Sequence, residues 1–280
     1  TYPGYEDLIQ KIYNQNQEHV FKYWEDLDNK EKEILLSDLS TIDFEEFNIQ
    51  FEMTKSDNES IQEYSPAGYI QIPQASAEKA HFEEARATGR QAIREGRVCA
   101  FVVAGGQGSR LGFDGPKGAF KISPIKNKSL FQIHSEKILK TQKKYDVEIP
   151  FLIMTSQMNY DATVEHFEEN SYFGLSRDNV YFFKQDMIPS MDMDGKLILS
   201  TKNTVFKNPD GHGGSLTALH KSGMLKMLAE KNIDLISYFQ VDNPIAQIID
   251  PIFLGFHILE KAEISSKALR KAYPQEKVGN

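Results

Sequence analysis

The first part of the chain carries apolar residues at the spacing of an α-helix. Between residues 5 and 51 they recur three or four positions apart, as Leu8 and Ile12 do, and this period predicts a small helical region. A polar, turn-rich stretch follows. Residues 77–96 then form an amphipathic pattern that ends at a glycine, which predicts one further helix.

After residue 96 the pattern changes to short apolar runs separated by helical patterns. The predicted strands are "VCAFVVA", "EIPFLIMTS", "VYFFKQ", "DLISYFQVDNP" and "IFLGFHIL", and the predicted helices cover residues 129–140, 159–169 and 216–229. Buried strands that alternate with helices are typical of βαβ units. The sequence therefore predicts an α/β fold, with a mixed, mostly parallel sheet and helices on both faces. We expect a helical region over residues 1–90 and the α/β domain over residues 91–280.

Composition and charge narrow the classes of function. The chain has 280 residues and a net charge of −8, which argues against a general nucleic-acid binder, because such proteins need clustered Lys and Arg. No apolar run is long enough to span a membrane. The first residues are acidic and polar, unlike a secretory signal, so a chain that is complete at its start is expected in the cytoplasm. Cys99 is the single cysteine, which excludes an internal disulfide and a cysteine-based zinc site.

A glycine-rich stretch follows the first predicted strand. In "FVVAGGQGSRLGFDGPKGAF", residues 101–120, closely spaced glycines remove side chains so that backbone N–H groups can approach an anion, and Arg110 and Lys117 add positive charge. The loop leaves the carboxyl end of a strand, where open α/β sheets bind their ligands. A phosphate group fits this loop best.

Two common phosphate-binding patterns do not match this loop. The dinucleotide fingerprint requires a glycine where Leu111 stands, and the Walker pattern requires Ser or Thr directly after the lysine, where Gly118 follows Lys117. The loop instead reads A-G-G-x-G-[ST]-R-L-G followed by P-K.

In this form the loop resembles the signature of sugar-1-phosphate nucleotidyltransferases, and it is most similar to the eukaryotic-type UDP-sugar pyrophosphorylase family. Three later segments, "FFKQDMIPSMDMDGKLIL", "NPDGHGGSLTAL" and "YFQVDNPIAQIIDPIFLGFHI", resemble the family's uridine-binding, sugar-binding and metal-binding segments in the same order. The resemblance implies a Rossmann-like, GT-A-like nucleotidyltransferase fold. Members are longer at the carboxyl end, so it also implies that the catalytic domain over residues 91–280 is incomplete there.

The resemblance implies a uridylyltransferase that joins UTP and a hexose or N-acetylhexosamine 1-phosphate into a UDP-sugar and releases pyrophosphate. Arg110 would hold the leaving pyrophosphate, because its fork can donate to two phosphate oxygens. Lys117 would hold the α-phosphate, and Asp242 would bind Mg²⁺. Without the resemblance, Asp242 also fits the cap of a turn at "DNP".

The resemblance also implies a set of binding residues. The nucleotide would contact Ala104, Gly105, Gly106, Gly108, Thr155, Gln185 and Gly211, and the sugar would contact His212 and Gly213. Thr155 ends the strand in "MTS", and a Thr-Ser pair at the end of a strand is usually a helix cap. His212 stands where the N-acetylglucosamine enzymes carry Asn and where glucose or broad-specificity enzymes carry His, so the identity of the sugar stays open.

Two other functions compete with this interpretation. One is a nucleotide-sugar binding module without catalysis, because the resemblance does not include the family's elements toward the carboxyl end. The other is a glycosyltransferase whose metal motif would be Asp192 and Asp194. The second is disfavoured, because "DMDGKLIL" reads more simply as a hairpin turn.

Overall fold

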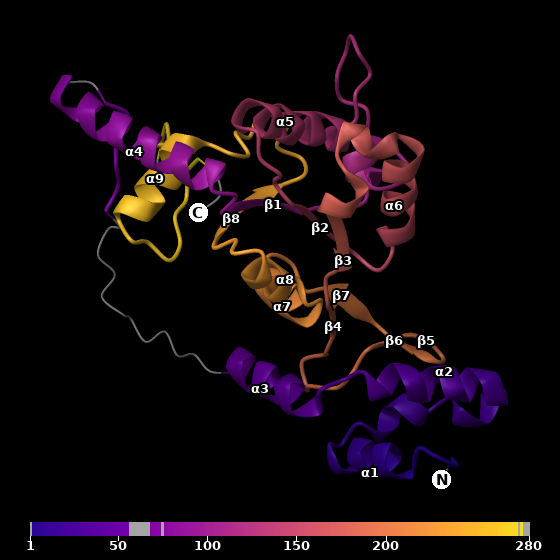
Figure 1. Cartoon of the computed structure of the whole chain (residues 1–280). Helices are drawn as coiled ribbons and strands as arrows, with labels where there is room; N and C mark the ends of the chain where they lie inside the picture. The colour runs from indigo at the N-terminus through magenta and orange to yellow at the C-terminus, as the bar shows by residue number, and fades with distance from the viewer. Residues whose placement is uncertain (1, 56–67, 74–75, 274, 277–280) are drawn as a thin grey trace. The chain divides into compact units, whose positions relative to one another are not determined.

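The computed structural model describes residues 2–55, 68–73, 76–273 and 275–276 (Figure 1). Contacts within the chain divide it into two compact units. Unit 1 contains Thr1–Tyr69 and Gln185–Thr217, and unit 2 contains Ile70–Lys184 and Ala218–Asn280. Each unit is described by itself below.

Unit 2 is built on a four-stranded parallel sheet. The strands lie in the order β3-β2-β1-β8 and cover Val180–Lys184, Phe151–Thr155, Val98–Val103 and Leu235–Gln240. All four were predicted as strands, and their parallel pairing confirms the predicted α/β class. Because β8 pairs with β1, the chain returns past β2 and β3 to the other side of the first strand.

Alternation along β1 explains why helices cover both faces of this sheet. Ala100 and Val102 pack into one core with residues of α5 (Leu130–Tyr145) and α6 (Tyr160–Glu169). Cys99 and Phe101 point to the opposite face and pack against residues of α7 (Gly214–Lys221) and α8 (Met224–Glu230). Figure 1 shows these helices on the two sides of the strands. A strand buried on both faces must be apolar throughout, as this one is.

The remaining elements of unit 2 are helical. They are α4 (Ser76–Arg94), α9 (Pro251–Leu259) and the 3₁₀ turns η3 (Ser109–Leu111), η4 (Lys117–Ala119), η5 (Ser171–Gly174) and η6 (Arg177–Asn179). The predicted helix over residues 216–229 is split into α7 and α8 at Gly223, whose φ is +77°.

One predicted strand is wrong. "IFLGFHIL" lies within the helix α9, which begins with Asp250 as a capping residue and Pro251 in its first turn. The carboxylate of Asp250 accepts a hydrogen bond from the N–H of Ile252 at 3.0 Å. A short run that is apolar throughout does not distinguish a buried strand from a buried helix. The capping residue and proline before it were the signals that favour a helix.

Unit 1 contains the predicted N-terminal helices and a segment from much later in the chain. The helical elements are α1 (Glu6–Asn14), η1 (Glu18–Phe21), η2 (Trp24–Asp26), α2 (Asn29–Ser40) and α3 (Phe44–Lys55), and the strands are β4 (Met187–Pro189), β5 (Leu199–Thr201), β6 (Thr204–Val205) and β7 (Lys207–Pro209). Leu197 and Val205 share a core with Leu35 and Leu39 of α2. The two compact units therefore differ from the domains expected from the sequence, which meet at residue 90. The expected domain limits stay a prediction.

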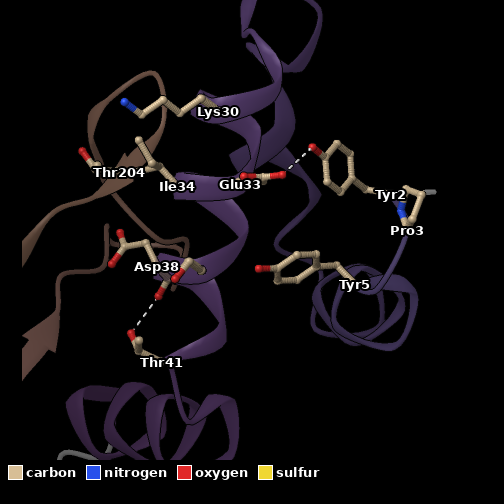
Figure 2. A pocket seen from close by; sticks show the side chains of 10 residues that line it. Tyr2, Pro3, Tyr5, Lys30, Glu33, Ile34, Asp38, Thr41 and Thr204 are labelled. Atoms are coloured by element: carbon tan, nitrogen blue, oxygen red, sulfur yellow. Dashed lines mark hydrogen bonds between the residues drawn. The ribbon is translucent and has the colours of Figure 1, made fainter.

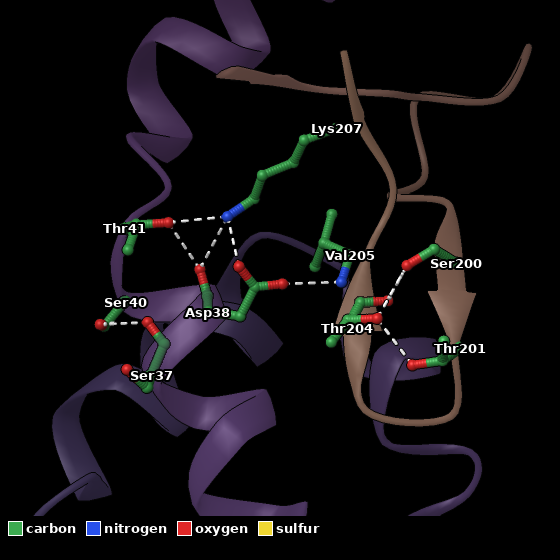
Figure 3. A network of polar contacts seen from close by, with 9 residues as sticks. All are labelled: Ser37, Asp38, Ser40, Thr41, Ser200, Thr201, Thr204, Val205 and Lys207. Carbon is green, nitrogen blue, oxygen red and sulfur yellow. Dashed lines mark hydrogen bonds and ion pairs between the residues drawn. The ribbon is translucent and has the colours of Figure 1, made fainter. Parts of the chain in front are cut away.

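A polar network ties β7 to helix α2 in unit 1 (Figure 3). The carboxylate of Asp38 accepts a hydrogen bond from the N–H of Val205 at 2.7 Å and forms an ion pair with Lys207. The Lys207 ammonium also donates to the Thr41 hydroxyl at 2.9 Å. Both charged side chains are largely buried, so the segment that precedes residues 211–213 is firmly anchored.

The segment with Asp192 and Asp194 forms a hairpin turn, as predicted. The Asp192 carboxylate accepts hydrogen bonds from the backbone N–H groups of Asp194 and Lys196, each at 2.9 Å. These bonds lower its pKa. Gly195 supplies the left-handed backbone conformation, with φ +75°. The Asp192 carboxylate is therefore engaged within its own turn.

Candidate functional site

The glycine-rich stretch forms a narrow loop between β1 and the 3₁₀ turn η4. The N–H of Gly108 donates to the carbonyl of Gly115 at 2.9 Å, and the N–H of Lys117 donates to the carbonyl of Gly106 at 3.0 Å. A Cβ atom on Gly108 would lie 2.7 Å from the Phe113 ring and 3.1 Å from the Phe113 carbonyl oxygen. Only glycine therefore allows the loop to close at residue 108.

Three successive N–H groups of this loop are available for a ligand. Within the described residues, no hydrogen bond is donated by the backbone N–H of Gly105, Gly106 or Gln107. Gly108 differs, because its N–H is engaged by Gly115. Clustered unpaired N–H groups form an anion-binding concavity, so the first part of the loop has the chemistry to bind a phosphate.

Lys117 and Asp242 meet beside this loop. The Lys117 ammonium lies 2.9 Å from a carboxylate oxygen of Asp242, although the two residues are 125 positions apart. A Cβ built on Gly106 would lie 3.7 Å from the same ammonium nitrogen. Both side chains are partly exposed, at 28% and 45%. The structure thus joins two predicted site residues at the adjacent ends of β1 and β8.

Arg110 lies in η3 within the same loop and is exposed. It makes no hydrogen bond or ion pair with another residue in the part of the chain that the structure describes. Thr155 is placed differently. Its side chain is fully buried and its hydroxyl donates to the carbonyl of Phe183 at 3.2 Å. The Thr155 hydroxyl is therefore engaged within the sheet.

Ala104, directly after β1 in unit 2, is fully buried, and unit 1 holds the remaining predicted binding residues, which are Gln185, Gly211, His212 and Gly213. β4 pairs antiparallel with β7 through Met187 and Pro209, and the N–H of Asp210 donates to the carbonyl of Asp186 at 3.1 Å. The paired ribbon thus ends at Asp186 and Asp210, which directly adjoin the predicted residues Gln185 and Gly211 in sequence. Gln185 is buried, whereas Gly211 and the adjacent His212 and Gly213 are exposed.

Sequence reasoning missed three residues that support the loops of unit 2. The buried side chain of Asn159 binds backbone carbonyls of the glycine loop. On α5, the ring of His134 contacts the carbonyl of Val241 at 2.8 Å, and the ammonium of Lys137 donates to the carbonyl of Ala246 at 2.9 Å. The two α5 residues hold the segment around Asp242. No local sequence signal marks any of the three, because each acts on a distant part of the chain.

The pKa of His134 is lowered to about 4, chiefly by burial and in smaller part by the charge of Lys137. The hydrogen bond with Val241 and the charge of Asp242 act in the opposite direction. Its ring is therefore neutral at pH 7. Because a carbonyl accepts but cannot donate, Nε2 of the neutral ring carries the proton in this contact.

A cavity of about 740 Å³ lies in unit 1 between α2 and the start of the chain (Figure 2). Its lining residues include Tyr2, Tyr5, Lys30, Glu33 and Thr204. None of the predicted site residues lines it. The cavity is therefore separate from the residues that the sequence marks for phosphate chemistry.

Comparison with known proteins identifies the family. Residues 43–280 match the family described as UTP–glucose-1-phosphate uridylyltransferase, and the chain belongs to this family. The UDP-N-acetylglucosamine diphosphorylase 2 of Arabidopsis thaliana is 35% identical, with an alignment that covers 100% of this chain and 58% of that protein. The UDP-N-acetylglucosamine pyrophosphorylase of Saccharomyces cerevisiae is 33% identical over 98% of this chain and 60% of its own length.

A solved structure agrees with these relatives. The uridine diphosphate N-acetylglucosamine pyrophosphorylase of Trypanosoma brucei, in complex with an inhibitor, superposes with a TM-score of 0.76 at 29% identity and covers 94% of this chain and 56% of that one. The chain thus spans a little over half the length of the relatives that it matches. Among the described residues, none of the helices is long and apolar enough to cross a membrane.

Proposed function

We propose that this chain carries the UTP-binding and catalytic residues of a uridylyltransferase that forms a UDP-sugar and pyrophosphate from UTP and a sugar 1-phosphate. The observation that supports this most directly is the Lys117–Asp242 pair, 2.9 Å apart beside three unengaged N–H groups of the glycine loop. A triphosphate requires a cation and backbone N–H donors, and its metal ion requires a carboxylate. All three kinds of group lie together at the ends of β1 and β8. Membership of the uridylyltransferase family supports the same reaction.

The chemistry asks the protein for alignment and charge neutralisation. An oxygen of the sugar phosphate attacks the α-phosphorus of UTP in line, and pyrophosphate leaves. The glycine-loop N–H groups and Lys117 would bind phosphate oxygens, while Arg110 would bind the leaving pyrophosphate as a bidentate donor. The Lys117 ammonium has three N–H donors, so it can turn one toward a phosphate while another stays on Asp242. The ion pair therefore keeps the lysine beside the loop until the nucleotide arrives.

Asp242 fits a magnesium site that is completed by substrate. Within the described residues, no group of three or more His, Cys, Asp or Glu side chains is placed to hold a metal ion. A single carboxylate suits Mg²⁺, which keeps several waters and takes substrate phosphates as ligands. When bound, Mg²⁺ would neutralise charge on the phosphates during the displacement.

The relatives favour N-acetylglucosamine 1-phosphate as the sugar substrate, because several are named for that sugar. His212 instead favours glucose 1-phosphate or a broad specificity, because the resemblance places Asn at this position in the N-acetylglucosamine enzymes. The test is a panel of sugar 1-phosphates offered with UTP and Mg²⁺, with pyrophosphate release as the readout. We expect release that is fastest with the N-acetylhexosamine compound. No release with any sugar would contradict the proposed reaction.

Two substitutions test the assigned residues. Lys117→Ala and Arg110→Ala each remove a cation at a reacting phosphate, and we expect turnover to fall by a factor of about 100 or more. Lys126→Ala and Arg177→Ala remove exposed cations elsewhere in unit 2 and serve as matched controls. Near-normal turnover in either site variant, with an unchanged unfolding midpoint, would refute its role.

Metal removal tests the role of Asp242. We expect chelation with EDTA to abolish pyrophosphate release and added Mg²⁺ to restore it. Asp242→Asn should raise the Mg²⁺ concentration needed for half-maximal turnover about tenfold or more, because an amide lacks the negative charge that Mg²⁺ prefers. Full turnover in EDTA would remove magnesium from the proposal.

The anion-binding groups of the glycine loop also fit a second candidate function. The unengaged N–H groups of the glycine loop and Lys117 would bind a nucleotide-sugar whether or not the chain reacts it, so a nucleotide-sugar binding module without catalysis also fits the described residues. Calorimetry with UTP and UDP-sugars, beside the turnover assay, separates the two: binding without pyrophosphate release supports the module. The cytoplasmic location expected from the sequence stays a prediction, which imaging of the tagged protein would test.

A further inference from the structure

The buried side chain of Asn159 makes four hydrogen bonds. Its side chain is 1% exposed. The carboxamide oxygen accepts from both the N–H and the hydroxyl of Ser156, each at 2.9 Å. The carboxamide nitrogen donates to the carbonyl of Ala104 at 3.0 Å and to the carbonyl of Gly106 at 3.3 Å. The amide is thus fully satisfied, with one end on its own turn and the other on the glycine loop.

The orientation of this amide follows from its partners. The backbone N–H of Ser156 can only donate, so the oxygen of Asn159 must face it. The carbonyls of Ala104 and Gly106 can only accept, so the NH₂ group must face the loop. No other arrangement of the side chain satisfies all four groups.

Asn159 does not act as an ordinary helix cap. It precedes α6, where an Asn side chain usually accepts a hydrogen bond from the first turn, but here it makes no such bond. The helix gives up a cap that is typically worth about 1 kcal/mol. The side chain instead reaches 55 positions back along the chain to the loop. This exchange indicates that the loop contact is the reason for an Asn at this position.

The contact determines which way the loop presents its donors. All peptide bonds in the described chain are trans, so a carbonyl and the following N–H point in opposite directions. With the carbonyls of Ala104 and Gly106 held by Asn159, the N–H groups of Gly105 and Gln107 are turned away from it. Those are two of the three N–H groups that are free to bind an anion.

We propose that Asn159 is a positioning residue that holds the glycine loop in its anion-binding conformation before a nucleotide arrives. It touches neither substrate nor metal and acts through the backbone of residues 104–107. The inference rests on the proposed function for the identity of the ligand, UTP. The loop conformation itself is a property of the free protein and is tested without nucleotide.

The test compares two variants with wild type. Asn159→Asp keeps the shape and the oxygen that faces Ser156 but replaces the NH₂ donor with a second oxygen against two carbonyls. We expect amide hydrogen exchange at Gly108 and Lys117, whose N–H groups close the loop, to accelerate at least tenfold without nucleotide. We expect UTP affinity, by calorimetry with Mg²⁺, to fall at least tenfold. Asn159→Ala, which buries no charge, gives the same test if the Asp variant does not fold.

Thr163→Val is the matched control. Thr163 is fully buried on the same helix, and its hydroxyl donates to the carbonyl of Asn159 at 2.6 Å, away from the loop. We expect it to lower the unfolding midpoint but to leave loop exchange and UTP affinity within twofold of wild type. Unchanged loop exchange in both Asn159 variants overturns the proposal. Failure of the wild-type chain to bind UTP would instead refute the proposed function, and loop exchange would still decide the role of Asn159.

Discussion

The ring of His134 is enclosed by the core of unit 2 between Phe239 and the carbonyl of Val241. Because burial lowers its pKa to about 4 from an ordinary 6.5, the unfolded chain binds more protons than the folded chain between these two pH values. Stability linked to His134 is therefore complete above about pH 6.5 and is lost as the pH falls toward 4, by up to about 3 kcal/mol.

Urea unfolding between pH 4 and 7.5 tests this contribution. We expect the free energy of unfolding of wild type to fall with pH more steeply than that of His134→Gln, which cannot take up a proton and can still donate to the Val241 carbonyl. The difference between the two profiles isolates His134 from carboxylates that titrate in the same range. Parallel profiles would show that the pKa of His134 does not change when the chain unfolds.

At the scale of elements, the crossing of α4 and α9 depends on two glycines. A Cβ on Gly89 would lie 1.8 Å from the carbonyl oxygen of Pro251, and a Cβ on Gly255 would lie 1.7 Å from the carbonyl oxygen of Ala85. Both obstacles are backbone atoms, so a side chain cannot turn away to make room. Gly89→Ala must push the helices apart and should cost about 1–3 kcal/mol or more.

Chemical denaturation measures this cost. Gly68→Ala is the control, because a Cβ there would meet no atom within 4 Å. We expect a change within about 0.5 kcal/mol for the control. Equal stability of Gly89→Ala and wild type would contradict the close approach of the two helices.

The attachment of the β7 strand to α2 is a second property at this scale. Asp38 and Lys207 are only 23% and 16% exposed, and Asp38 also accepts from the Val205 N–H. Asp38→Ala removes the carboxylate that balances the charge of the Lys207 ammonium and leaves the Val205 N–H without its acceptor, although the ammonium keeps its hydrogen bond to Thr41. We expect it to lower stability by about 2–4 kcal/mol. Lys202→Ala breaks the exposed Lys202–Asp26 pair, with more than half of each side chain in solvent, and should cost less than about 1 kcal/mol. Thermal unfolding of the two variants compares them directly.

At the scale of the whole molecule, the proposed function requires an acidic chain to bind an anionic ligand. With a net charge of −8, the UTP affinity that the proposed function requires would have to come from local groups such as Lys117 and the glycine-loop N–H groups. A ligand that binds only the folded chain raises stability by about 2.7 kcal/mol at 100 times its dissociation constant. We therefore expect UTP with Mg²⁺ to raise the unfolding midpoint of wild type as its concentration increases.

Lys117→Ala provides the comparison for this thermal shift. The variant should unfold near the wild-type midpoint without nucleotide, because the Lys117–Asp242 pair is partly exposed. It should show a much smaller shift with UTP. An equal shift in both proteins would mean that UTP binds without Lys117.

Patterns that are local in sequence predicted most of the fold. The short apolar runs of the strands, the glycine before "VCAFVV" and the turn chemistry at Asp192 each depend on neighbouring residues, so they could be interpreted without tertiary information. The failure at residues 252–259 has the same origin. Their uniform apolarity reflects burial, which both a helix and a strand can satisfy.

The motif around the glycine loop likewise indicated an anion site, with Arg110 and Lys117 as its cations, from the sequence alone. Only the tertiary structure decided which distant residues serve that loop. The strand order β3-β2-β1-β8 brings Asp242 to Lys117, and the start of α6 brings Asn159 to Ala104. Such partners are set by how the sheet is assembled and how helices pack on it, and no local pattern of residues records that arrangement.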